Sequence, residues 1–345
     1  MAKKKKKRGS AKRRALKILN CFLSIILALM LGITVLANGI LNKMNRTDGT
    51  VESMSAEEME DYLAGERAED DLGTMPTMNE AEVEWGEGAA QIPESENTIN
   101  VLLIGQDRRP GESRARSDSM ILISVNKDTK SITMTSFLRD LYVKIPGYGS
   151  NRLNASYSWG GMELLNETLE QNFGVVVDGN VEVDFKQFAM IIDLLGGVDL
   201  ELRGDEANLI NSEVSGTLTK GMNHLNGEQT LSYARIRKLD ANRDFSRTER
   251  QRKVLGALME QLKNSGSTVL MDLLNGVLPM ITTDMTNKEI LGHAADVFPI
   301  LPQVTVVSQR IPADGAYKNA AISGMSVVVA DMDAARQLLL ETIGG

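Results

Sequence analysis

The stretch INVLLIGQDRRPGESRARSDSMILISVNKDTKSITMTSFLRD, residues 99–140, decides the fold of this chain. Its apolar runs predict strands at 99–104, 120–125 and 132–136. A charged loop separates the first two strands, and a turn at 126–130 separates the second from the third. The strand ends and the loop therefore carry the charged side chains of the stretch.

These charged side chains combine carboxylates with guanidiniums. The loop and the residues beside it contain Asp107, Arg108, Arg109, Arg114, Arg116 and Asp118, and the third strand ends at Arg139 and Asp140. Carboxylate oxygens suit Mg²⁺, and the guanidinium fork binds phosphate oxygens. The pattern favours a divalent cation that bridges a phosphorylated ligand. The alternative is a surface loop with solvated ion pairs, which are common and contribute little stability.

The charge of the chain is concentrated at its N-terminus. The 345 residues have a formal net charge of −8, yet segment 1–17 contains ten Lys and Arg residues and no acid. Segment 18–41 has no charged residue and exceeds the ~20 residues that a membrane-spanning helix needs. We predict a basic cytoplasmic segment, 1–17, a transmembrane signal anchor, 18–41, and an extracytoplasmic remainder. A signal peptide cleaved near 35–37 is the alternative, but the apolar run is longer than is usual for one.

Cysteine and histidine usage disfavours two kinds of site. Cys21 is the only cysteine and falls within the predicted anchor, so we expect no disulfide in the external part. His224 and His293 are the only histidines, which makes a zinc site built from His and Cys improbable.

The chain changes character after the predicted anchor. Segment 42–97 contains sixteen acids against three bases and few large apolar residues, so we predict an acidic, mostly disordered linker with a short helix near 56–64. From residue 98 to 345 the pattern is globular. It predicts strands at 181–183, 198–202, 304–308 and 325–329, and helices at 161–173, 185–195, 228–236, 247–263, 286–297 and 333–342. Asp184 is a predicted N-cap, and capping boxes are predicted at Ser246 and Thr286.

Strands that alternate with helices predict an α/β domain with a mixed central β-sheet flanked by helices. No nucleophile elbow, Cys–His pair, zinc-protease motif, Walker A loop or dinucleotide fingerprint occurs in the sequence. The remaining Asp and Arg residues at loop and helix ends fit transfer chemistry on a pyrophosphate, in which positioning and charge neutralisation dominate.

Eight motifs in order give the chain a family resemblance. They are NVLLIGQDRR, RSDSMIL, SFLRD, RLNASYSWGG, VDFKQF, DLLGGV, LNGEQTLSYARIR and DFSRTERQR, and they span about residues 98–263. This run resembles the LytR–CpsA–Psr (LCP) family of cell-wall glycopolymer ligases. The resemblance implies a single LCP-like domain in a membrane-anchored phosphotransferase. It would use Mg²⁺ and move teichoic acid, capsule or a similar glycopolymer from a polyprenyl-pyrophosphate carrier to peptidoglycan.

The resemblance also assigns roles to individual residues. Asp107 and Asp118 correspond to the metal-binding aspartates of the family. The residues that would line the pyrophosphate are Arg116, Arg139, Arg235, Arg237, Arg247 and Gln251. We name Asp118, Arg116, Arg139 and Arg237 as candidate catalytic residues. Two positions depart from the family pattern: Leu138 stands where proline is usual, and Gln106 where a small residue is common.

Several neighbouring residues have open assignments. Arg152 and Asn154 either bind the substrate or only shape their loop, and Asp140 either belongs to the site or simply pairs with Arg139. For Arg243 and Asp244 we favour a loop ion pair, and for Arg250 and Arg252 a solvated helix surface.

Two other functions remain possible from the sequence. One is a pyrophosphatase that acts on the same lipid-linked glycan with water as the acceptor. The other is a non-catalytic module that binds anionic polymers or lipid carriers. Nucleic-acid binding is disfavoured because the only basic run lies on the predicted cytoplasmic side of the membrane.

Overall fold

The computed structural model describes residues 36–51, 54–69, 72–86, 92, 97–106, 116–240, 243–263 and 275–344. The chain divides into two compact units, Met1–Lys43 and Met44–Gly345. In the first unit, the backbone is helical over 36–41, and the N–H of Asn42 donates to the carbonyl of Asn38 at 2.9 Å. None of the helices within the described ranges is long and apolar enough to span a membrane. Segment 1–17 and most of the predicted anchor, 18–35, lie outside these ranges.

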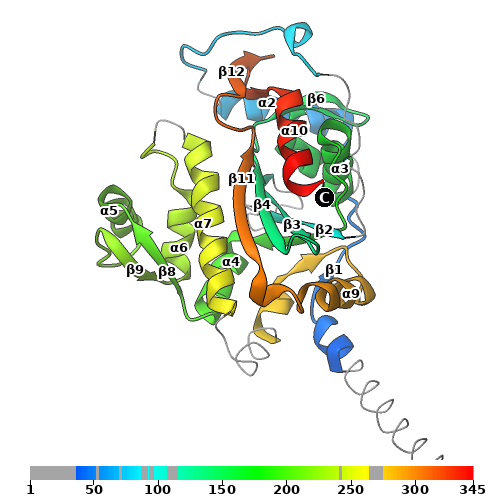
Figure 1. The fold of residues 1–345 in the computed structure, drawn as a ribbon. Helices are drawn as coiled ribbons and strands as arrows, with labels where there is room; N and C mark the ends of the chain where they lie inside the picture. The colour runs from blue at the N-terminus through cyan, green and yellow to red at the C-terminus, as the bar shows by residue number, and fades with distance from the viewer. Residues whose placement is uncertain are drawn as a thin grey trace, which may run out of the picture. The chain divides into compact units, whose positions relative to one another are not determined.

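A seven-stranded mixed sheet organises the second unit (Figure 1). Its strands, in spatial order, are β1 (Asn45–Arg46), β10 (Thr282–Thr283), β7 (Gly179–Asp184), β2 (Thr98–Gln106), β3 (Ser117–Asn126), β4 (Ser131–Phe137) and β11 (Thr305–Ile311). β2–β3–β4 form an antiparallel meander, whereas β2 pairs with β7, and β4 with β11, in parallel. The predicted α/β fold with a mixed central sheet is confirmed.

Helices cover both faces of the sheet. On one face, Leu102, Met120 and Phe137 pack against α3 (Leu153–Phe173) and α10 (Met332–Ile343). On the other face, Ile121 and Met134 pack against α7 (Arg243–Lys263) and the end of α9 (Asn287–Val297). Successive strand residues point to opposite faces, so the apolar run of β3 and the apolar residues of β4 contribute to two cores.

A lobe beside α7 has a core of its own (Figure 1). It consists of α4 (Phe185–Leu194), β8 (Val198–Leu202), α5 (Gly204–Glu213), β9 (Gly221–Leu225) and α6 (Gly227–Arg235). β8 and β9 pair antiparallel, and their apolar residues pack with Tyr233 and Val254. α6 belongs to this lobe and packs beside α7 through the shared core, so the end of α6 lies close to the start of α7.

Two more hairpins lie at the other end of the second unit. β5 (Tyr142–Ile145) pairs with β6 (Gly149–Arg152), and β12 (Tyr317–Ile322) pairs with β13 (Met325–Ala330). Short 3₁₀ segments, η1 (Glu80–Glu82), η2 (Leu278–Met280) and η3 (Leu301–Gln303), complete the described elements.

Capping residues explain several helix ends. Asp184 caps α4 and Thr286 caps α9, each with a reciprocal capping box, as predicted. The box predicted at Ser246 is wrong, because α7 begins earlier, at Arg243, and Ser246 lies inside it. α3 also begins earlier than predicted, at Leu153, and has a break at Gly160 and Gly161, where we placed its start.

The described residues between 42 and 97 depart from the disordered linker that we predicted. β1 pairs with β10, and α2 (Ala56–Glu69) packs Met59, Tyr62 and Leu63 against the core. Trp85 stacks on Tyr142 at 5.9 Å between ring centroids. The few apolar residues of this acidic segment are widely spaced, so its composition resembles disorder. Their packing partners belong to the folded domain and cannot be read from the segment itself.

Leu63 offers a direct test of this packing, because it contacts two core clusters. We expect Leu63→Ala to lower the free energy of unfolding by about 1–3 kcal/mol, from lost burial and the cavity that is left. Chemical denaturation of the second unit measures this change. Glu60→Ala, an exposed position on the same helix, is the matched control and should change stability by less than about 0.5 kcal/mol. Equal stabilities for both variants would show that α2 does not pack on the domain.

Candidate active site

The site is centred on Asp118, at the start of β3. The antiparallel register pairs Met120 of β3 with Phe137 of β4, so the residues just before Met120 lie beside those just after Phe137. Arg139 therefore reaches Asp118, and its Nη1 lies 2.5 Å from Oδ1 of the carboxylate. The first pair of the site follows directly from the β3–β4 hairpin.

Two further arginines arrive from the distant α6–α7 region. Arg247, on the first turns of α7, donates from Nη2 to the Asp118 carbonyl at 3.3 Å and lies 3.2 Å from Oδ1 of Asp244. Arg237 follows α6 and donates from Nε to the same Asp244 oxygen at 2.8 Å. Asp118, Asp244 and three arginines thus form one connected cluster. The structure brings these predicted residues together, whereas their roles in a reaction stay a prediction.

Asp140 and Arg152 extend the cluster. Oδ1 of Asp140 lies 3.4 Å from Nε of Arg139 and 3.7 Å from Nη1 of Arg152, and its carboxyl group hydrogen-bonds to that of Asp244. Burial raises the pKa of Asp140, and the nearby Asp244 raises it further. Burial also acts to raise the pKa of Asp244, but Arg247, Arg139 and Arg237 hold it well below its usual range. The environment therefore shifts Asp140 toward its protonated form and Asp244 toward its ionised form.

Positive charge exceeds negative charge among the described residues of this cluster. Four guanidiniums face three aspartates, and one of these aspartates is held toward its neutral form. Burial, together with Arg139 and Arg237, lowers the pKa of Arg247 to about 10, although Asp244 and Asp118 oppose the shift. Arg139 and Arg247 also hold the pKa of Asp118 below its usual value, against the effect of its burial. The cluster has the electrostatics of a site that binds an anion.

Several donors in the cluster lack acceptors. Nη2 of Arg237, Nε of Arg247 and Nε of Arg139 are buried, and none of these atoms has a hydrogen-bond partner within the described structure. A buried donor without an acceptor is costly, at about 1–3 kcal/mol or more for a charged group. A bound phosphate group would accept hydrogen bonds from these donors, and its negative charge would neutralise the surplus positive charge.

The other predicted residues surround this cluster. Gln251 accepts a hydrogen bond from Ser119 at 3.0 Å, next to Asp118. The guanidinium carbon of Arg116 lies 6.0 Å from the Tyr62 ring centroid, and that of Arg235 lies 4.7 Å from the Phe185 ring centroid.

Asn154 and Asp107 complete the predicted set. The backbone N–H of Asn154 donates to the carbonyl of Arg139 at 3.1 Å, and its buried Oδ1 has no hydrogen-bond partner among the described residues. Asp107, the other predicted metal ligand, lies outside the described ranges, as do Arg108, Arg109 and Arg114.

The two departures from the family pattern are accommodated. Leu138 is buried, and its N–H donates to the carbonyl of Ile311 at 3.1 Å, a bond that proline could not make. This bond fixes the backbone immediately before Arg139. Gln106, at the end of β2, is also buried and donates to Glu182, which accepts a second hydrogen bond from Tyr157. Both residues therefore anchor the strand ends that lead into the site.

The expectation that Arg250 and Arg252 are solvated is wrong, because both are buried. Nε of Arg250 lies 2.8 Å from Oε1 of Glu206, and Nη1 donates to the Ile236 carbonyl at 3.2 Å. Arg250 thereby fixes the backbone between Arg235 and Arg237.

Arg252 has a different setting, in which it donates to Ser308 of β11 at 2.7 Å. The helical periodicity of the segment does not reveal that α7 is enclosed by the sheet on one side and the lobe on the other.

Asp244 is the site residue that the sequence interpretation undervalued. It stands three positions before Arg247, and this spacing is the signal that could have identified it. Because we placed the helix start at Ser246, we assigned Asp244 to a loop instead of the same helical face.

Asp118 fits one ligand position for the predicted Mg²⁺. It contacts Arg139 through Oδ1, and no hydrogen bond within the described structure involves its other carboxylate oxygen. Magnesium is usually held by one or two carboxylates, with phosphates and water as its other ligands. The described residues contain no group of three or more His, Cys, Asp or Glu arranged to hold a metal ion by themselves.

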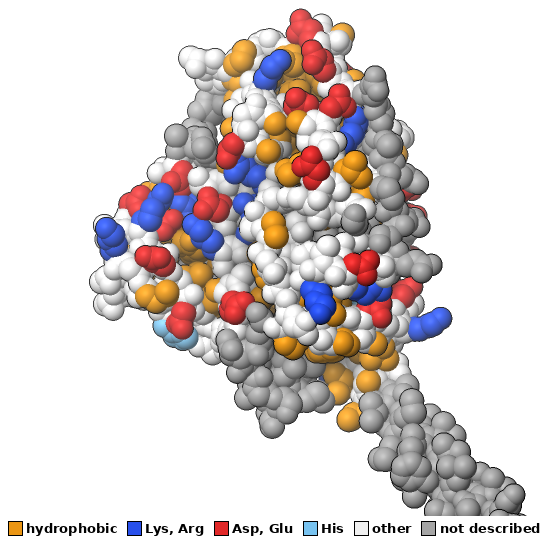
Figure 2. Space-filling model, viewed as in Figure 1, with side chains coloured by type: hydrophobic (Ala, Val, Ile, Leu, Met, Phe, Trp, Pro, Cys, Tyr) orange, Lys and Arg blue, Asp and Glu red, His pale blue; other side chains and the backbone are white. Residues whose placement is uncertain are grey.

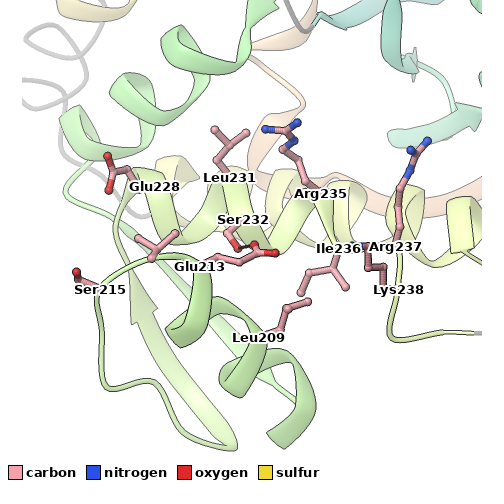
Figure 3. Close-up of a pocket in the computed structure, with 11 residues that line it drawn as sticks. Leu209, Glu213, Ser215, Glu228, Leu231, Ser232, Arg235, Ile236, Arg237 and Lys238 are labelled. Carbon is pink, nitrogen blue, oxygen red and sulfur yellow. Dashed lines mark hydrogen bonds between the residues drawn. The ribbon is translucent and has the colours of Figure 1, made fainter. Parts of the chain in front are cut away.

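A cavity of about 730 Å³ adjoins the site at Arg237 (Figure 3). α5 and the residues after it form one side, and α6 and the residues after it form the other. Figure 3 shows Arg235, the last residue of α6, and Arg237, just after it, pointing away from Glu213 and Leu209. On the surface of the surrounding lobe, acidic and basic side chains are interspersed (Figure 2).

Comparisons with known proteins agree on one family. The model of the LytR_cpsA_psr family matches residues 50–342. The chain is 31% identical over 228 residues to regulatory protein MsrR of Staphylococcus aureus, covering 65% of this chain and 68% of that protein. It is 32% identical over 219 residues to the polyisoprenyl-teichoic acid–peptidoglycan teichoic acid transferase TagU of Bacillus anthracis, covering 63% and 70%.

A solved structure described as TagT bound to LIIa-WTA has a similar fold. Its TM-score with this chain is 0.60, at 26% identity, and the alignment covers 76% of this chain and 99% of that one. The described cluster lies entirely within the part that the family model matches.

The Asp140–Asp244 pair predicts a pH-dependent stability difference. A group whose pKa is raised by folding stabilises the fold while it is protonated, and that stabilisation is lost as pH rises through the folded-state pKa. Asp140→Asn mimics the protonated form at every pH. We expect the variant to be as stable as the wild type near pH 4. At pH 8 the variant should be more stable, by about 1.4 kcal/mol for each unit by which folding raises the pKa of Asp140. Urea denaturation at both pH values measures the difference, and a difference that is constant with pH would contradict the assignment.

Proposed function

The chain belongs to the LytR_cpsA_psr family, and from this premise we propose that it is a glycopolymer–peptidoglycan phosphotransferase. It would move a glycopolymer such as teichoic acid or capsule from a polyprenyl-pyrophosphate carrier to peptidoglycan during cell-wall assembly. The similarity to TagU, whose name states such a reaction for teichoic acid, supports this proposal.

One observation carries the proposal. Arg237 and Arg247 contact the same aspartate and keep buried donors without acceptors, beside Arg139 and Asp118. Arginine forks match phosphate oxygens in geometry and remain charged when buried, which suits a diphosphate. A purely structural ion-pair network would balance its charges, whereas this cluster has surplus positive charge.

The proposed reaction is an in-line displacement at phosphorus. A hydroxyl oxygen of the peptidoglycan acceptor forms a bond to the phosphorus that carries the donor sugar. The bond from that phosphorus to the bridging oxygen breaks, and polyprenyl phosphate leaves with the electron pair. The hydroxyl proton passes to solvent or to a nearby acceptor. Arg139, Arg237 and Arg247 stabilise the charge that develops on the phosphate oxygens, and Arg116, Arg152, Arg235, Asn154 and Gln251 position the substrate.

Asp107 and Asp118 would hold Mg²⁺ in this proposal, and the bound ion would neutralise part of the pyrophosphate charge. Arg139 orients Asp118 through their hydrogen bond. The lowered pKa of Asp118 keeps its carboxylate ionised, which is the form that a metal ligand requires.

The proposed placement follows from the sequence. Segment 18–41 would anchor the chain in the cytoplasmic membrane, with its N-terminus in the cytoplasm and residues 42–345 outside. A membrane-bound polyprenyl donor and a wall-bound acceptor would both be within reach of such a domain.

We expect Asp118→Ala and Arg237→Ala each to lower the transfer rate by about 10²- to 10³-fold, because each removes a charged group that acts on the pyrophosphate. The assay uses a polyprenyl-pyrophosphate glycan donor and peptidoglycan, with the linked product detected by mass spectrometry. Lys253→Ala, which removes an exposed positive charge from the same helix as Arg247, is the matched control and should retain activity.

The products of the same assay separate the possible functions. Glycan linked to peptidoglycan supports transfer, whereas free glycan phosphate would indicate a pyrophosphatase. Binding of the lipid without any product would indicate a non-catalytic module. Near-wild-type turnover in both site variants would refute the proposed centre.

Removal of divalent metal tests the role of Asp118 separately. We expect EDTA to lower the wild-type transfer rate about as strongly as Asp118→Ala does, and added Mg²⁺ to restore it. In Asp118→Ala, EDTA should cause little further loss, because the metal site is already damaged. If EDTA leaves the wild-type rate unchanged, the metal-dependent version of the mechanism is wrong.

A further inference from the structure

The cavity between α5 and α6 is joined to the proposed reaction centre through one side chain. Arg237 lines the cavity, and its Nε donates to Asp244 in the site. Its buried Nη2 has no hydrogen-bond partner in the described structure. Arg237 therefore connects the cavity wall to the groups that would bind the pyrophosphate.

The two ends of the cavity differ in charge. Arg237 and Lys238 lie at one end, and Glu228 and Ser215 lie at the other, with Glu213 between them (Figure 3). Oε2 of Glu213 accepts a hydrogen bond from Ser232 at 2.7 Å, which fixes the carboxylate on the cavity wall. The half of the cavity away from the reaction centre thus presents carboxylates and hydroxyls.

The remaining lining is aliphatic. Leu209, Val214, Leu231 and Ile236 contribute apolar surface among the polar groups. Alternating apolar surface and hydrogen-bond acceptors suits a sugar, which has C–H faces and donating hydroxyls. A polyprenyl chain would desolvate the two carboxylates and the three cationic side chains, Arg235, Arg237 and Lys238, that also line the cavity. The volume of about 730 Å³ is within the usual range for small-molecule sites, about 300–1,000 Å³.

We propose that this cavity binds the acceptor: an N-acetylhexosamine chain whose hydroxyls donate to Glu213 and Glu228, with one hydroxyl directed past Arg237 toward the phosphorus. The inference rests on the proposed function.

The test compares Glu213→Gln/Glu228→Gln with the wild-type full chain in the transfer assay, with each substrate varied in turn. Glutamine keeps an acceptor for Ser232 but removes the negative charge. We expect the KM of the double variant for a soluble peptidoglycan oligosaccharide to rise about tenfold, because hydrogen bonds to charged acceptors are lost. The donor KM and kcat should stay within about twofold of the wild-type values. Glu201→Gln, an exposed glutamate on β8 outside the cavity, is the matched control and should leave all three values unchanged.

Thermal unfolding of each variant shows whether the fold is intact, and binding of inorganic pyrophosphate shows whether the reaction centre is intact. Unchanged acceptor KM in the double variant, while the wild type transfers normally, would overturn the cavity assignment and leave the proposed function standing. A rise in the donor KM alone would also overturn it, because the cavity would then hold the donor sugar.

A binding measurement without turnover separates the two proposals further. Saturation-transfer NMR with the same oligosaccharide should show saturable binding to the wild type that the double variant weakens about tenfold. This result would support the cavity assignment even if no transfer were detected, in which case the proposed function fails by itself. Absence of saturable binding to the wild type would overturn the cavity assignment.

Discussion

The contact between Arg139 and Asp118 is the constraint on which the site depends. Nη1 and Oδ1 are 2.5 Å apart at the end of the β3–β4 hairpin, and both groups are largely removed from water. Desolvation of two charges is costly, and their attraction offsets this cost only when the geometry is good and further hydrogen bonds are made. Here the further bond comes from Arg247, which contacts the Asp118 backbone from a helix more than a hundred residues later.

Much of the surrounding structure fixes that geometry. The N–H of Leu138 binds the Ile311 carbonyl and secures the backbone before Arg139. Arg250 binds Glu206 and the Ile236 carbonyl, and so secures the bend that carries Arg237. Removal of one partner from such a buried pair typically costs about 3–5 kcal/mol, because the other charge is left buried alone. The lobe formed by α4–α6 therefore has a role in the site, because it holds Arg237 in place.

The arrangement also separates two kinds of charged residue that look alike in the sequence. Arg250 is compensated by acids and serves the fold, whereas Arg237 and Arg247 keep unsatisfied donors and share a surplus of positive charge. The surplus is visible in Arg247, whose pKa is lowered to about 10 by burial and by neighbouring arginines. Binding of a phosphorylated ligand would relieve the electrostatic cost of this surplus positive charge.

Local pattern in the sequence was sufficient for five of the seven strands of the sheet, for most helices and for the identity of the charged residues. The strands of residues 99–140, the caps at Asp184 and Thr286 and the motif arginines all depend on neighbours along the chain. Three features depended on tertiary structure instead: the packing of α2, the burial of Arg250 and the meeting of Asp244 with Arg139 and Asp140. Each requires partners remote in the chain, and burial and pKa are set by those partners. The sequence by itself determined which groups could bind a diphosphate, and the fold decided which of them are compensated and which remain available to do so.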